Sequence, residues 1–122
     1  MPDLFFLLTR INDSLKNKRL ISGLVNNAGV RHRERVLNIR ESDLKKTFET
    51  NFNGTLNILE SLKCLKSKCS AVFITSDKCY RNNEWIWGYR ENDELGGDDP
   101  YSASKGAAEI AISSYFESYF KK

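Results

Sequence analysis

The stretch LISGLVNNAG, residues 20–29, decides the fold. Its first six residues are mainly apolar, and they are followed by a turn of asparagine, alanine and glycine. A short apolar run that ends in such a turn is typical of a parallel strand buried on both faces. We therefore predict a strand over residues 20–25, with residues 26–29 forming the turn at its carboxyl end.

Helical patterns lie on both sides of this strand. Upstream, leucine and isoleucine recur at helical spacing over residues 4–17. Downstream, Ser42 or Asp43 can cap a helix that ends among the lysines of residues 63–68. The spacing predicts that this helix buries one stripe, namely Leu44, Phe48, Phe52, Thr55, Leu56, Leu59 and Leu62.

A second strand and a third helix follow. Residues 71–75 form a five-residue apolar run, and residues 101–120 return to a helical pattern. Between them, residues 76–100 show no clear periodicity, and a loop of this length is usually functional.

The predicted order of helix, strand, helix, strand, loop and helix is the alternation of an open α/β sheet with right-handed crossovers. Two strands alone make a marginal sheet. We therefore expect residues 1–122 to form one partial Rossmann-like domain, a doubly wound parallel sheet that lacks its first βαβ unit.

Composition argues against several classes of protein. Hydrophobic residues make up 40% and charged residues 29% of the chain, which is a globular balance. A net charge of +3 from scattered basic residues indicates solvated surface rather than a nucleic-acid site. The apolar residues 4–8 are too few to span a membrane, and they lack the features of a signal peptide.

The cysteines and the histidine argue against two further kinds of site. The three cysteines are odd in number and lack C-x-x-C spacing, so they predict neither a disulfide framework nor a metal site. His32 is the single histidine and cannot build a metal or nucleophile site without other ligands. Reduced thiols favour a cytoplasmic protein.

Tyr101 and Lys105 are the strongest candidates for chemistry. Four residues apart in a helix, they share one face and lie about 6 Å apart along the axis. The ammonium group favours the phenolate, so the pair can provide a base. The alternative is a solvated helix face.

A second group of polar residues follows the second predicted strand, at the edge where open sheets bind ligands. It consists of Ser76, Asp77 and Lys78. The alternative for Asp77 and Lys78 is a surface ion pair.

Four segments of the chain resemble a known family. They are TSDKCY at residues 75–80, EWIWGYRE at 84–91, LGG at 95–97 and DPYSASK at 99–105. These segments resemble the nucleotide-sugar dehydratases of the extended short-chain dehydrogenase/reductase family, which includes the NAD-dependent epimerases and dehydratases. Within it they are most similar to the CDP-glucose 4,6-dehydratases, because Lys78 stands where the dTDP-glucose enzymes have an acidic residue.

Two upstream segments are similar to short-chain dehydrogenases more widely. They are NNAG at residues 26–29 and TN at 50–51 followed by GT at 54–55. The short members of the family commonly have NNAG, whereas nucleotide-sugar dehydratases more often have another alanine-rich turn there. An ordinary hydrogen-bonded turn is the alternative for Asn27.

The resemblance implies an NAD-dependent dehydration of CDP-glucose to CDP-4-keto-6-deoxyglucose by oxidation, loss of water and return of the hydride. It implies that Tyr101 removes the proton of the sugar 4-hydroxyl, that Lys105 holds the nicotinamide ribose, and that Ser76 hydrogen-bonds the reacting oxygen. Asp77 and Lys78 match the positions that eliminate water. The implied cofactor-binding residues are Asn27, Ala28, Gly29, Asn51, Tyr101 and Lys105, and no metal is implied.

The 122 residues contain no glycine cluster of the G-x-x-G-x-x-G kind. The resemblance implies that such a loop holds the pyrophosphate of NAD, so we expect a fragment that depends on segments supplied elsewhere. A non-catalytic remnant and a small carbonyl or alcohol reductase remain alternatives. Trp85, Trp87 and Tyr89 suit either a substrate pocket or simple packing. The sequence leaves open whether the chain forms a homo-oligomer.

Overall fold

The structure is a computed structural model that describes residues 23–26, 29 and 39–121. The helix expected over residues 4–17 lies outside the described residues, as do Asn27 and Ala28. The described elements are, in chain order, β1 (Gly23–Asn26), α2 (Glu41–Phe48), η2 (Glu49–Asn53), α3 (Gly54–Lys63), β2 (Ser70–Phe73), η3 (Asp77–Cys79), α4 (Pro100–Tyr115) and η4 (Phe116–Phe120).

The two strands pair in parallel, as the sequence predicts. Gly23 is the partner of Ser70, and Asn26 is the partner of Phe73. β2 begins one residue earlier and ends two residues earlier than the apolar run suggests. Its last two predicted residues, Ile74 and Thr75, leave the ladder and lead into the short helix η3.

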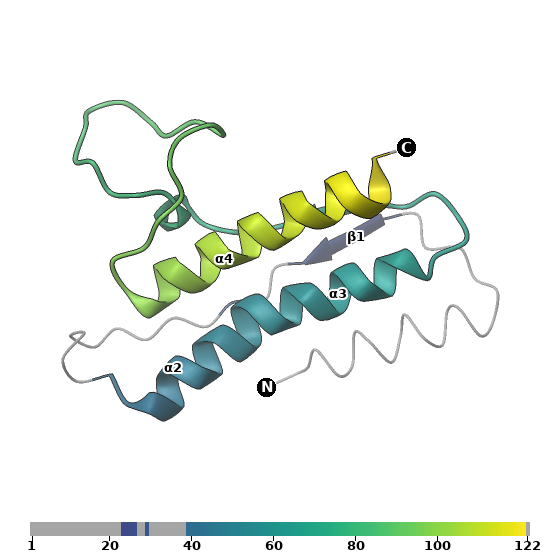
Figure 1. Cartoon of the computed structure of the whole chain (residues 1–122), viewed down its shortest axis with the longest axis horizontal. Helices are drawn as coiled ribbons and strands as arrows, with labels where there is room; N and C mark the ends of the chain where they lie inside the picture. The colour runs from purple at the N-terminus through teal and green to yellow at the C-terminus, as the bar shows by residue number, and fades with distance from the viewer. Residues whose placement is uncertain (1–22, 27–28, 30–38, 122) are drawn as a thin grey trace.

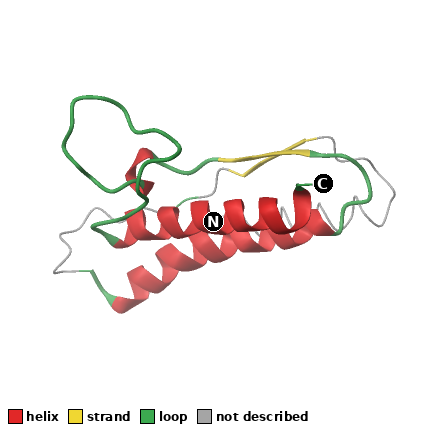
Figure 2. Ribbon diagram, turned by 45° about the horizontal axis from the view of Figure 1, so that its top comes forward, coloured by secondary structure: helices red, strands yellow, loops and turns green. Residues whose placement is uncertain are grey.

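The helices form one layer on one face of the strands (Figure 2). α2, η2 and α3 form one continuous rod, and α4 lies beside it and runs in the same direction (Figure 1). β1 runs the opposite way. The carboxyl end of β1 therefore points toward the end of the molecule at which α4 begins (Figure 1). The buried apolar residues of the described part of the chain are Ile58, Leu59, Cys79 and Ala108.

The predicted cap of the first described helix is wrong. The N-cap residue is Arg40, whose side chain makes no capping hydrogen bond, and the helix begins at Glu41. Asp43 lies in the first turn and accepts a hydrogen bond of 2.9 Å from Nε of Arg40. A carboxylate in the first turn is stabilised by the helix dipole without occupying the cap position, and this explains the mistaken assignment.

The predicted buried stripe of this helix is also partly wrong. Leu44 is 41% exposed. The buried residues are mainly small or polar, namely Thr47, Asn51, Gly54, Thr55, Ile58 and Leu59. Hydrophobic periodicity selects the largest apolar side chains. Where the helix packs closely against α4, however, many of the buried side chains are small. The end of α3 at Lys63 agrees with the prediction.

α4 begins one residue before Tyr101 because Asp99 caps it. The carboxylate accepts hydrogen bonds from the backbone N–H groups of Tyr101 at 2.8 Å and Ser102 at 3.1 Å, and Pro100 occupies the first turn. η4 extends the helix to Phe120, as predicted. None of the helices in the described part of the chain is both long and apolar enough to cross a membrane.

The long loop leaves the body of the molecule beside the start of α4 (Figure 1). Its neck is closed by a bridge between Tyr80 and Leu95 and by a 2.8 Å hydrogen bond from Arg81 N to Glu94 O. At Gly97, an added Cβ would lie 2.4 Å from the backbone nitrogen of Ala103. Only glycine allows this close contact between the neck and α4.

Candidate active site

The candidate site lies where β1 and β2 end and α4 begins. Four segments supply its residues: Gly29 after β1, the π-helical turn η2, the residues that follow β2 and the first turns of α4. The carboxyl edge of a parallel sheet is the usual position for ligand binding in open α/β folds.

Lys105 is the most deeply buried charged group at this edge. Its residue is 5% exposed, and its Nζ donates a hydrogen bond of 3.3 Å to the carbonyl oxygen of Ile74 at the end of β2. Burial lowers the pKa of Lys105 below its ordinary value, and the negative charge of Glu109 partly opposes this shift. A buried ammonium therefore lies directly at the end of the strand.

Gly29 and Asn51 lie next to this ammonium. A Cβ added to Gly29 would be 3.3 Å from Nζ of Lys105 and 3.7 Å from Oδ1 of Asn51. The absence of a side chain lets the backbone after β1 approach both groups. The structure thus brings together three of the residues that the sequence selects, although they come from three separate segments.

Asn51 lies in the π-helical turn η2 and is 1% exposed. Its Nδ2 donates a 2.9 Å hydrogen bond to Oγ of Ser104, and Ser104 Oγ donates to the carbonyl oxygen of Tyr101 at 2.7 Å. The hydroxyl of Thr55 donates to the backbone oxygen of Asn51 at 2.8 Å. Single π-helical turns often occur at functional sites, and this one aims a buried amide at the beginning of α4.

The cap at Asp99 holds the half-buried Tyr101 at the beginning of α4. Burial raises the pKa of Asp99, but hydrogen bonds from the side chain and backbone of Ser102 and from the backbone of Tyr101 outweigh it. The pKa of Asp99 therefore lies below its ordinary value, and the cap is a carboxylate at neutral pH.

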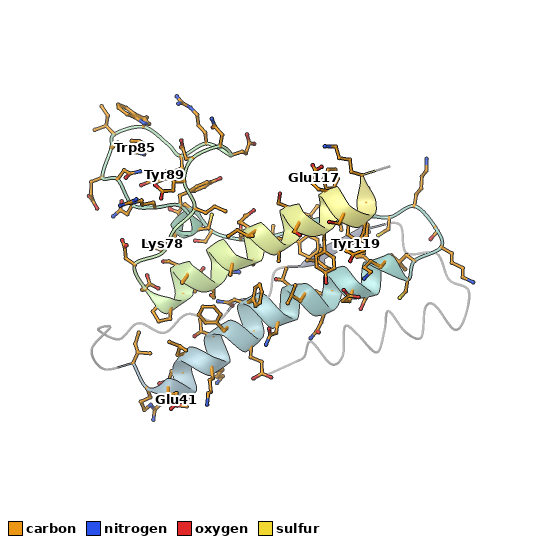
Figure 3. All side chains as sticks on the ribbon, viewed as in Figure 1. Glu41, Lys78, Trp85, Tyr89, Glu117 and Tyr119 are labelled. Atoms are coloured by element: carbon orange, nitrogen blue, oxygen red, sulfur yellow. The ribbon has the colours of Figure 1, made fainter. Side chains whose placement is uncertain are left out.

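Ser76 caps the short helix η3. Its Oγ accepts a hydrogen bond of 3.3 Å from Lys78 N and donates one of 3.1 Å to Oδ1 of Asp77. Asp77 and Lys78 are exposed, and Lys78 lies at the base of the loop beside the start of α4 (Figure 3). Within residues 39–121, Asp77 bonds to Ser76, and no ion pair joins it to Lys78.

The aromatic residues of the loop pack mainly with one another. The rings of Tyr80 and Tyr89 stack with centroids 5.3 Å apart, and Trp85 lies 5.6 Å from both Trp87 and Tyr89. Figure 3 shows Trp85 and Tyr89 in the projecting loop, beyond Lys78. These contacts support the packing interpretation of the loop aromatics.

Sequence reasoning missed three residues of this region. An aspartate directly before a proline is a common start of a helix, and this signal could have identified Asp99 as the N-cap of α4. Glu109 lies four residues after Lys105, which places both on one face of α4. Ser104 has no such signal, because its partner Asn51 lies 53 residues away. Among the described residues, no cluster of histidine, cysteine and acidic side chains could hold a metal ion.

Comparison with known proteins identifies the family. Residues 39–121 match the model of the GDP-mannose 4,6 dehydratase family. The chain belongs to this family. The matched region includes Asn51, Ser76 and the Tyr101–Lys105 pair, and it confirms the resemblance to nucleotide-sugar dehydratases and epimerases that the sequence motifs indicate.

One member of the family with high similarity is CDP-glucose 4,6-dehydratase of Salmonella typhimurium. It is 52% identical over 75 residues, which are 62% of this chain and 21% of that protein. This chain therefore spans only about a fifth of the relative's length.

Solved structures of other family members share the fold. UDP-glucuronic acid 4-epimerase from Bacillus cereus, in complex with UDP-glucuronic acid and NAD, has a TM-score of 0.74 and 18% identity. The match covers 97% of this chain and 34% of the epimerase. For dTDP-glucose 4,6-dehydratase from Bacillus anthracis the TM-score is 0.68, the identity is 23%, and the match covers 91% and 31% of the two chains. These similarities show that the chain has the α/β fold of this enzyme class.

Proposed function

We propose that this chain contains the reaction centre of an NAD-dependent nucleotide-sugar dehydratase that converts CDP-glucose to CDP-4-keto-6-deoxyglucose. The observation that supports this most strongly is the buried Lys105, which bonds to Ile74 O beside Gly29 and Asn51, one helical turn after Tyr101. The 52% identity to CDP-glucose 4,6-dehydratase supports CDP-glucose as the substrate.

The residues present fit NAD. Gly29 leaves its backbone open beside the Lys105 ammonium, and a side chain there would occupy this space. The Lys105 ammonium can donate hydrogen bonds to ribose hydroxyls. We assign cofactor contacts to Asn27, Ala28, Gly29, Asn51, Tyr101 and Lys105. When bound, NAD supplies the acceptor of the hydride and later its donor.

Tyr101 and its neighbours serve the oxidation step in this proposal. The phenolate of Tyr101, which the Lys105 ammonium stabilises, takes the proton of the sugar 4-hydroxyl as the hydride leaves carbon 4, and it becomes a neutral phenol. Ser76 Oγ hydrogen-bonds the reacting oxygen, and this requires its hydroxyl to turn away from Asp77. Asn51 maintains the position of α4 through Ser104.

Asp77 and Lys78 serve the elimination step. Oxidation at carbon 4 makes the proton on carbon 5 acidic, so a base can remove it while an acid protonates the departing 6-hydroxyl. We assign the acid to Asp77 and the base to Lys78. Their exposure at the edge of the strand agrees with contact to a substrate that enters from solvent.

The proposal also concerns the extent of the domain. We infer that residues 1–122 form one part of a doubly wound Rossmann-like domain, and that the glycine-rich loop and the substrate lobe come from other segments. Cys64, Cys69 and Cys79 are free thiols, which suits a reducing cytoplasm. A small carbonyl reductase is the weaker candidate, because the high identity is to a dehydratase.

A chimera tests the proposal, because the relative supplies the glycine-rich loop and the substrate lobe. The region of the Salmonella CDP-glucose 4,6-dehydratase that matches this chain is replaced by the corresponding residues of this chain. We expect the chimera to bind NAD and to form the 4-keto-6-deoxy product, and its Tyr101→Phe variant to bind NAD without forming product. A folded chimera that binds NAD and CDP-glucose but forms no product would show that these residues are a non-catalytic remnant.

A further inference from the structure

Glu109 connects helix α4 to the end of strand β2. The hydroxyl of Thr75 donates a hydrogen bond to the carboxylate of Glu109, 34 residues further along the chain. Both side chains are half-buried. Glu109 also lies one turn after Lys105, so the two side chains project from the same face of α4.

Thr75 occupies a decisive place in the site because it lies between two groups that face the reaction centre. The residue before it, Ile74, provides the carbonyl oxygen that accepts the 3.3 Å hydrogen bond from Lys105 Nζ. The residue after it, Ser76, caps η3 and provides the hydroxyl assigned to the reacting oxygen. A contact that holds Thr75 therefore aligns both neighbours relative to α4.

The charge of Glu109 acts on the same region. Burial lowers the pKa of Lys105, and Glu109 opposes this effect. Glu109 also acts on Cys79 of η3 and on Tyr80, the residue after it. Burial and then the Glu109 charge raise the pKa of Cys79, whereas burial, then Cys79 and then Glu109 raise the pKa of Tyr80.

The other charged residues of η3 act elsewhere. The charge of Asp77 contributes to the raised pKa of Cys79, and the charge of Lys78 contributes to the lowered pKa of Asp99. Near the Lys105 amino group, Gly29 has no side chain and the side chain of Asn51 is uncharged. Glu109 is a carboxylate whose charge favours the ammonium form of Lys105.

We propose that Glu109 is a positioning residue of the reaction centre, because it ties α4 to the segment after β2 that presents Ile74 and Ser76. Its charge also favours the ammonium form of Lys105. The catalytic consequence rests on the proposed function. The effects on Lys105 and on the strand end concern this chain alone and can be measured without turnover.

Two substitutions separate the contact from the charge. Glu109→Gln removes the charge but keeps an oxygen that can accept the hydrogen bond from Thr75. Thr75→Val removes the donated hydrogen bond but keeps the charge and a similar shape. Glu117→Gln is the matched control for the charge, because Glu117 lies in η4, the continuation of α4, is 57% exposed and pairs with Lys121.

The charge effect is tested by an NMR titration of Lys105 in the 122-residue chain with isotope-labelled lysine. The signal is assigned from its loss in Lys105→Arg. We expect the pKa of Lys105 to fall further in Glu109→Gln, because burial remains and the opposing charge is gone, and to stay unchanged in Glu117→Gln. An unchanged pKa in Glu109→Gln would overturn this part of the proposal.

The contact is tested first in the same chain by amide hydrogen exchange. Thr75→Val should speed exchange near Ser76, and Thr75→Ser, which keeps the hydroxyl, should restore protection. In the active chimera, Thr75→Val should lower kcat by about tenfold with little change in KM, since displaced catalytic groups reduce the rate more than binding. Equal exchange and equal kcat in Thr75→Val and Thr75→Ser would remove the positioning role.

The pH dependence of the chimera's activity distinguishes the charge of Glu109 from a purely structural role, because loss of a structural contact alone would leave it unchanged. Activity that requires the Lys105 ammonium is lost as the pH rises through the pKa of Lys105. Glu109→Gln should shift this alkaline loss to lower pH, and Thr75→Val should leave it in place. If the chimera forms no product at all, the proposed function fails, whereas the titration and the exchange measurements still decide the role of Glu109.

Discussion

The side-chain amide of Asn51 and the hydroxyl of Ser104 form a buried hydrogen bond of 2.9 Å between η2 and α4. Asn51 is 1% exposed and Ser104 is completely buried. Because Ser104 also donates to Tyr101 O, the bond fixes the first turn of α4 relative to η2. The candidate catalytic tyrosine is thus held in place by an amide from a distant part of the chain.

Asn51→Ala should lower the free energy of unfolding of the chain by about 1–3 kcal/mol, because it breaks a buried hydrogen bond and leaves a cavity. Urea denaturation followed by circular dichroism measures the change. Asn57→Ala is the control, since Asn57 is exposed on the neighbouring helix α3, and it should change stability by no more than about 0.5 kcal/mol. Equal losses in the two variants would contradict the role of the bond.

Tyr101→Phe and Lys105→Met should have separable effects in the active chimera. Tyr101→Phe removes the proton acceptor, so the formation of NADH in a single turnover should slow by about 10²–10⁴-fold, while NAD affinity barely changes. Lys105→Met should weaken NAD binding and slow NADH formation together. The double variant should be less impaired than the product of the single effects. Near-normal NADH formation in Tyr101→Phe would reject the assigned base.

Asp77→Asn should slow the loss of water more than the first oxidation, because an amide cannot protonate the departing hydroxyl. In a single turnover of the chimera, NADH should then accumulate before it is consumed again. Asp93→Asn provides a control for removal of a carboxylate from the same loop. An NADH time course that matches that of the parent chimera would remove Asp77 from the elimination step.

Gly29→Ala should weaken NAD binding by the chimera by about tenfold, equivalent to about 1.4 kcal/mol. The added Cβ would lie 3.3 Å from Nζ of Lys105, so the lysine or the turn must move. Gly88→Ala is the matched control, because nothing lies within 4 Å of a Cβ at that position. Calorimetric titration measures both affinities, and unchanged binding by Gly29→Ala would show that this turn does not contact the cofactor.

Lys105 should make the stability of the chain depend on pH. Its pKa is lowered in the folded state from its ordinary value of 10.5, mainly by burial, so the unfolded chain binds more protons between the two values. The cost of burying the charge is therefore fully present below the folded pKa and is relieved as the pH rises toward 10.5.

Lys105→Met should accordingly be more stable than the parent chain at neutral pH, and the difference should shrink as the pH rises through this window. Urea denaturation at several pH values measures it. Cys79 and Tyr80 have raised pKa values, which make stability fall as the pH rises. Their effect is present in both chains, so it cancels in the difference between the two free energies of unfolding. A difference that is independent of pH would show that Lys105 is not buried as an ammonium.

The order and type of the main elements followed from the sequence, because apolar runs and helical spacing are local properties of the chain. The two strands and the helix of Tyr101 and Lys105 appear in the predicted order, although β1 includes Asn26, which was predicted in the turn, and β2 ends at Phe73 instead of Thr75. The spacing of Tyr101 and Lys105 needed only the geometry of one helical turn.

What the tertiary structure decided is which distant groups meet. Hydrophobic periodicity could not show that small residues of the η2 region face α4, because close helix packing depends on the partner surface. Nor could it show that Ser104 receives the amide of Asn51, that Gly29 approaches Lys105, or that Glu109 holds Thr75. These contacts join residues far apart in the chain, and only the packing of α4 against the strand ends brings them within hydrogen-bonding distance or van der Waals contact.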